Sequence, residues 1–148
     1  MTRLTITATN KKKPAPGAKL WVAARSPFDP KLAQDSVSAG DVSARLYIRG
    51  DAEGLRLPVE FLIVDGKDSE VCVLTSVVDS VGAFKTPLMS GHKRGVPLYP
   101  CQPHTTDANG GVTALFREPA RVEVFSGAAK RLEGMDLSEG DNALNIEL

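Results

Sequence analysis

The sequence lacks the material from which several classes of protein are built. Its 148 residues include only two cysteines and 5% aromatic residues, and its 18 basic side chains are matched by 18 acidic ones. Two cysteines are too few for a disulfide scaffold. A balanced charge provides no field that would attract nucleic acid or an anionic membrane. We therefore expect no nucleic-acid partner.

Long apolar runs are also missing. None approaches the roughly 20 residues that a membrane-spanning helix requires, and the first ten residues lack the apolar core of a signal peptide. We expect no membrane association and, without a signal peptide, synthesis in the cytoplasm. A mature fragment of a secreted protein would show the same features. The length suits one domain, which we expect to span residues 1–148.

What the chain does have is alternation of apolar and polar residues, the pattern of half-buried β-strands. The alternation is clearest where Val42, Ala44 and Leu46 interleave with polar residues. Strands are predicted over residues 3–9, 19–25, 42–49, 55–64, 70–78, 112–116, 121–126 and 143–148. Turn residues separate them. About eight strands at regular spacing are typical of an all-β fold, an antiparallel β-sandwich.

Three local patterns predict more than a single strand. Residues 105–126 contain a turn followed by two alternating runs, which predicts a β-hairpin. Asp29 before Pro30 is a favourable helix start, so one or two helical turns are expected at 30–36. Trp21, the only tryptophan, is expected to be a buried core anchor, because indole area stabilises a fold most when it is buried.

The segment 86–104 is the least regular part of the sequence. It contains four prolines and both histidines. Prolines lower the entropy cost of ordering an extended segment, so we expect a long Pro-rich loop that lies on a surface. Such loops are often functional, and we expect this one to contact a partner, with the 11–17 turn as a second contact. The expected contact residues are Met89, His92, Lys93, Arg94 and Tyr99. For the basic cluster 92–94, docking on an acidic patch and an ordinary solvated loop tip remain equal alternatives.

Candidate chemistry is sparse. Cys72, Cys101, His92 and His104 are side chains of the kinds that bind zinc, but only Cys101 and His104 are close in sequence, and the proline between them restricts the turn. Ordinary loop residues are the favoured interpretation. No nucleophile elbow, P-loop or H-E-x-x-H motif is present. We therefore expect no enzyme activity, no catalytic residues, no metal and no cofactor.

Two other possibilities stay open at this point. Tyr47, Tyr99 and Trp21 could provide stacking surfaces for a carbohydrate. A bond between the two cysteines would tie residue 101 to the strand at 70–78, but sequence separation does not say whether the sulfurs meet. Acidic residues in turns could ligate calcium, although their capping of the turns accounts for their presence without a metal ion. These residues are Asp65, Asp68, Asp107 and Asp141.

Three fragments resemble bacterial immunoglobulin-like and transthyretin-like modules. They are K-P-A-P-G-A-K-L-W-V at 13–22, T-D-A-N-G-G-V-T-A-L-F at 106–116 and L-S-E-G-D-N-A-L-N-I-E-L at 137–148. The resemblance implies an Ig-like antiparallel sandwich that holds, spaces or adheres without catalytic residues. A sandwich with an extended proline-rich arm also looks like the decoration and tail proteins of bacteriophage particles, which implies assembly in many copies on a virion.

These observations predict a non-enzymatic structural module that acts through protein-protein contacts. Its partner would be another protein or further copies of itself in a homo-oligomer, and a capsid decoration or a tail component would be its setting. A carbohydrate- or ligand-binding module is the alternative. A metal-dependent enzyme is the least favoured reading.

Overall fold

The computed structural model describes residues 1–50, 55–126 and 130–148. The fold is all-β: the described residues form fifteen strand segments and one short 3-10 helix, Gly66–Asp68. Fifteen is more than the eight or so expected, because strands also occur where a helix and a loop were predicted and at 13–14, 81–84 and 130–136, where no strand was predicted. None of the described helices is long and apolar enough to cross a membrane.

The chain divides into two compact units. Unit 1 comprises Met1–Ala24 and Gln102–Leu148, and unit 2 comprises Arg25–Cys101. Each has its own cluster of buried apolar side chains. The expected single domain stays a prediction, because compactness alone does not say whether two units unfold together.

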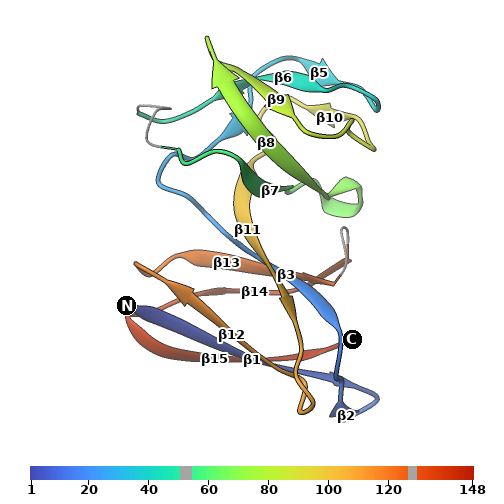
Figure 1. Cartoon of the computed structure of the whole chain (residues 1–148), viewed down its shortest axis with the longest axis vertical. Helices are drawn as coiled ribbons and strands as arrows, with labels where there is room; N and C mark the ends of the chain where they lie inside the picture. Colours follow the sequence, from blue (N-terminus) through green and yellow to red (C-terminus); the bar gives the residue numbers. More distant parts are fainter. Residues whose placement is uncertain (51–54, 127–129) are drawn as a thin grey trace. The chain divides into compact units, whose positions relative to one another are not determined.

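Unit 1 is a β-sandwich of two sheets (Figure 1). In one sheet β1 lies between β12 and β15, and β2 also pairs with β1; in the other the order is β14-β13-β3. The pairs are antiparallel except β1 with β15, which is parallel. The strands are β1 (Thr2–Asn10), β2 (Lys13–Pro14), β3 (Lys19–Ala24), β12 (Gly111–Phe116), β13 (Arg121–Ser126), β14 (Lys130–Asp136) and β15 (Gly140–Glu147).

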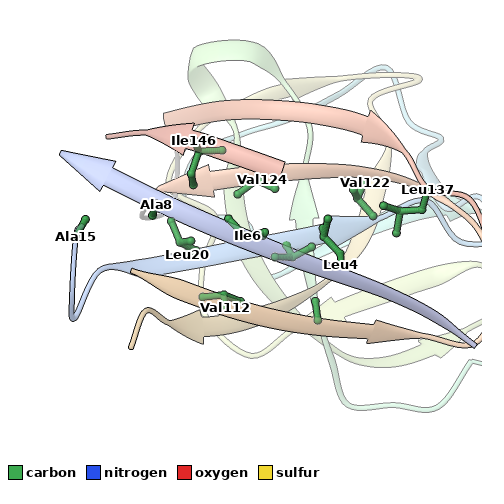
Figure 2. Close-up of a cluster of buried hydrophobic side chains, with 12 residues drawn as sticks. Leu4, Ile6, Ala8, Ala15, Leu20, Val112, Val122, Val124, Leu137 and Ile146 are labelled. Carbon is green, nitrogen blue, oxygen red and sulfur yellow. The ribbon is translucent and has the colours of Figure 1, made fainter. Parts of the chain in front are cut away.

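The core of unit 1 lies between these two sheets. Leu4, Ile6 and Ala8 alternate with polar residues along β1 and are fully buried, which confirms the first predicted strand. Figure 2 shows them facing side chains from the other sheet, among them Val122 and Val124 of β13. Alternation therefore identified the buried face of these strands correctly.

The predicted hairpin at 105–126 is wrong in its pairing. Both strands exist, but β12 pairs with β1, whereas β13 pairs with β3 and β14. Residues 117–120 therefore cross from one sheet to the other. Val112 and Val124 are buried in the same cluster from opposite sheets. An alternating pattern shows which face of a strand is buried but not which strand lies beside it.

Unit 2 is built on a sheet with the order β11-β7-β8-β9-β6-β4, and β10 and β5 form a separate pair. Leu98 N–H donates to Pro30 C=O, and Gly95 N–H donates to Leu32 C=O, so the two ends of this strand order meet. The strands are β4 (Lys31–Leu32), β5 (Ser36–Val37), β6 (Ser43–Tyr47), β7 (Val59–Ile63), β8 (Glu70–Val78), β9 (Val81–Phe84), β10 (His92–Lys93) and β11 (Leu98–Thr105), of which residues 98–101 belong to this unit.

Several predictions for unit 2 are confirmed. The strand at 70–78 is β8, which lies between β7 and β9, and the Asp65-Gly66 turn joins β7 to β8 as an antiparallel hairpin. The strand expected at 55–64 is shorter, since β7 begins at Val59. Pro58 precedes it, and proline has no N–H to donate to a ladder.

The helix expected at 30–36 is wrong. Asp29 has a left-handed φ of 44°, and its buried carboxylate pairs with Arg25 and Lys31, each at 3.3 Å. The residues that follow form β4 and β5, and Leu32 N–H bonds to a carbonyl outside the segment. Burial alone would raise the pKa of Asp29, but hydrogen bonds and charges from the two cations lower it.

The expected burial of Trp21 is also wrong. Its neighbours Leu20 and Val22 are fully buried, whereas Trp21 is only partly buried. Successive side chains of a strand point to opposite faces, so these two neighbours occupy the inner face of β3. The ammonium of Lys19 lies 4.9 Å from the centroid of the indole ring.

Candidate functional site

The five expected contact residues do not share one environment. Met89 is 69% exposed, and Lys93 and Arg94 are exposed as well. Tyr99 is partly buried in β11, so the predicted loop is wrong for the residues from Leu98 onward, which form a strand. Residues 89–94 include these three exposed side chains, and we call the surface that they make the 89–94 surface.

His92 does not belong to the exposed part of this surface. Its side chain has no exposed area, and each ring nitrogen lies beside a carboxylate: Nδ1 is 2.7 Å from Asp65 Oδ2, and Nε2 is 2.8 Å from Glu70 Oε2. A carboxylate only accepts hydrogen bonds, so both bonds form when the imidazole carries both protons. The expected partner contact through His92 is thus corrected, because the ring is enclosed by two acids of its own chain and has no exposed area.

Besides its contact with His92, Glu70 also bonds to the backbone of the 89–94 surface. Its side chain is 3% exposed, and it accepts hydrogen bonds from Met89 N–H at 2.8 Å and from Ser90 N–H at 2.9 Å. Each of these bonds is charge-assisted and stronger than a bond between neutral groups. One buried carboxylate at the start of β8 therefore orders the backbone on which Met89 is displayed.

Backbone contacts hold the other side of the segment. His92 pairs with Val37 across the β10 and β5 strands. Leu88 donates its N–H to Asp41 C=O and accepts from Gly40 N–H. The 89–94 surface is thus bonded on one side to Asp65 and Glu70 and on the other to residues 35–37.

The charges of the surface itself are weakly paired. Arg94 lies 3.1 Å from Asp35, but the two side chains are 61% and 97% exposed. An exposed pair of this kind contributes little to stability, because water and salt screen it. The positive charge of Lys93 and Arg94 is therefore accessible to an acidic group on a partner.

The cysteine and histidine residues considered for zinc are not assembled. Among the residues that the structure describes, no three His, Cys, Asp or Glu side chains are placed to hold a metal ion. Both thiols are free and buried. Phe61 of β7 pairs with both Cys72 and Pro100, which puts Cys72 and Cys101 two strands apart, about 10 Å. That is too far for a disulfide.

The burial of the two cysteine thiols also makes them poor nucleophiles. Burial, followed by the charge of Glu70, raises the pKa of Cys72 to about 12, and burial also raises the pKa of Cys101. A reactive cysteine needs a lowered pKa. Both nitrogens of His92 are engaged with carboxylates, so the ring has no free nitrogen to accept a proton from Ser90.

The sequence analysis missed Asp65 and Glu70 as partners of His92. Asp65 was interpreted as a turn residue, and Glu70 as the start of a strand. The usable signal was Glu70 itself, a charged residue at the head of the apolar run V-C-V-L. A charged side chain in such a position needs a partner, since burying an unpaired charge is costly. Its partner is 22 residues away in sequence, which the pattern could not indicate.

Comparison of the chain with protein-family models, with curated proteins and with solved structures gives no match.

Proposed function

We propose that this protein is a non-enzymatic structural module that assembles through protein-protein contacts, and that the 89–94 surface makes one of them. The observation that carries the proposal is the combination of an exposed Met89 with a backbone held by a buried carboxylate. Met89 is 69% exposed, and its own N–H is bonded to the buried Glu70.

This combination suits a contact site for an energetic reason. Ordering loops and side chains at an interface costs free energy, which a preorganised segment largely avoids. Methionine is apolar and adaptable, and it makes good contacts with surfaces of varied shape. Lys93 and Arg94 would surround it as a basic rim. The complementary partner has an apolar depression bordered by acidic groups.

The setting we propose is a repetitive assembly, such as a virion decoration or a tail component. An all-β sandwich, together with the resemblance of three sequence fragments to immunoglobulin-like modules, supports this setting. A carbohydrate-binding module is the second candidate. It is favoured by Tyr47, which is 54% exposed on β6 and paired across the ladder with Lys31.

A charge placed on the 89–94 surface tests the first proposal. Sedimentation velocity of Met89→Glu should show loss of the larger species that the unsubstituted protein forms. Val78→Glu is the matched control, because Val78 is also apolar, 65% exposed and in unit 2, and it should leave the distribution unchanged. Equal size distributions for all three proteins would refute the proposal, as would equal effects of the two substitutions.

A further inference from the structure

The sandwich of unit 1 has end strands that differ in charge. β14 and β15 each end a sheet, and both carry charged side chains, such as Arg131 and Glu133 on β14 and Asp141 on β15. Charges on end strands oppose unwanted pairing with other chains. β12 also ends a sheet, but its sequence, G-V-T-A-L-F, contains no charge.

The free edge of β12 is well suited to accept another strand. β12 pairs with β1 along its whole length, and no other described strand pairs with it. Figure 2 shows it, with Val112, alongside β1. Its alternate backbone N–H and C=O groups therefore point away from the sheet. Those of Gly111 are bonded to Asp107, which leaves those of Thr113 and Leu115 for a further strand. Leu115 on the outer face is 49% exposed.

We propose that β12 pairs with β12 of a second copy of this chain, antiparallel and about a two-fold axis, so that the two sheets continue into one another. A second copy is favoured because the strand brings no like charges together when it meets itself. The symmetric interface uses the same patch on both copies, and it stands independently of the 89–94 surface.

The register follows from the flanking residues. When Ala114 lies opposite Ala114 of the second copy, Thr113 lies opposite Leu115, and Gly111 lies opposite Arg117. The carboxylate of Asp107 is already beside Gly111, with its Oδ1 2.8 Å from Gly111 N. The exposed Arg117 of one copy thereby meets Asp107 of the other, and the contact occurs twice. In this register the paired residues are both odd-numbered or both even-numbered, so the side chains of each pair point to the same face of the joined sheet.

The same pairing accounts for Leu115. An exposed leucine on an outer strand face would be covered by Thr113 of the second copy, whose methyl group suits a cross-strand apolar contact. Each dimer buries two such pairs. The inner face continues in the same way, with Val112 opposite Phe116.

Charge substitutions at the paired positions test the proposal by sedimentation equilibrium. All variants are made in the Met89→Glu background, so that failure of the proposed function does not affect the outcome. The background protein should have twice the monomer mass of 15.8 kDa. Thr113→Lys with Leu115→Lys places like charges opposite each other twice and should give monomers. Thr113→Lys with Leu115→Glu places opposite charges there and should restore the dimer.

Thr5→Lys is the matched control. Thr5 is exposed on the same face and lies opposite Thr113 within one chain, but β1 is not an edge strand. This variant should remain dimeric. Three results would each overturn the proposal: a monomeric background protein, a dimeric variant with lysine at both 113 and 115, and a monomeric Thr5→Lys variant. Circular dichroism checks that each variant folds. If one does not, hydrogen exchange of the β12 amides in the unsubstituted protein tests the pairing instead. Protection of these amides should rise with protein concentration, and constant protection would refute the pairing.

Discussion

Replacing His92 with leucine removes the side-chain hydrogen-bond partner of a buried carboxylate without leaving a large cavity. In the folded protein the imidazole lies between Asp65 and Glu70, with contacts of 2.7 and 2.8 Å and no exposed side-chain area. After the substitution Glu70 would remain 3% exposed and bonded only to backbone N–H groups. A buried carboxylate that loses a hydrogen-bond partner is unfavourable.

The size of the effect follows from this burial. Leaving a buried hydrogen-bonding group without its partner costs about 1–3 kcal/mol, and more for a carboxylate, a large part of the roughly 5–15 kcal/mol by which a domain of ordinary stability is folded. Arg94→Leu is the control two residues away. It breaks an exposed pair with Asp35 and should lower the free energy of unfolding by less than about 1 kcal/mol.

Urea unfolding followed by far-ultraviolet circular dichroism measures both changes. A second substitution separates the stranded charge from lost packing: Glu70→Gln removes the charge but keeps the side chain's size. If the stranded charge dominates, His92→Leu with Glu70→Gln should lose less stability than the sum of the two single variants. A loss below about 1 kcal/mol for His92→Leu, or strict additivity, would refute the reasoning.

Two further predictions concern other buried features. Gly110 has a φ of +77°, and an added Cβ would lie 2.3 Å from Ala8 O, so Gly110→Ala should lower the free energy of unfolding by at least about 2 kcal/mol. The control is Gly17→Ala, at φ +70° with open space around it, which should cost only about 1–2 kcal/mol. Equal losses for the two variants would contradict the role of the contact with Ala8. The pKa of Cys72 is raised from 9.0 to about 12, which leaves about a thousandfold less thiolate below pH 9. A disulfide reagent should therefore label the folded protein far more slowly than the unfolded one. Rapid labelling of the folded form would be inconsistent with this burial.

Local sequence determined several of the strands and the faces that they bury. Leu4, Ile6 and Ala8 alternate with polar residues, and a strand with that alternation buries one face wherever it lies. The Asp65-Gly66 turn likewise defined its own hairpin, because the residues that fix a tight turn are adjacent in the chain.

Tertiary structure alone decided which strands are neighbours and where the charged groups meet. β12 and β13 follow one another but lie in different sheets, since either pairing would bury the same apolar face. His92 was assigned to the surface because its neighbours in sequence are basic, whereas its position is set by Asp65 and Glu70, which are 27 and 22 residues away. Patterns of period two describe one strand at a time. Burial of a charge depends on groups that only the folded chain brings together.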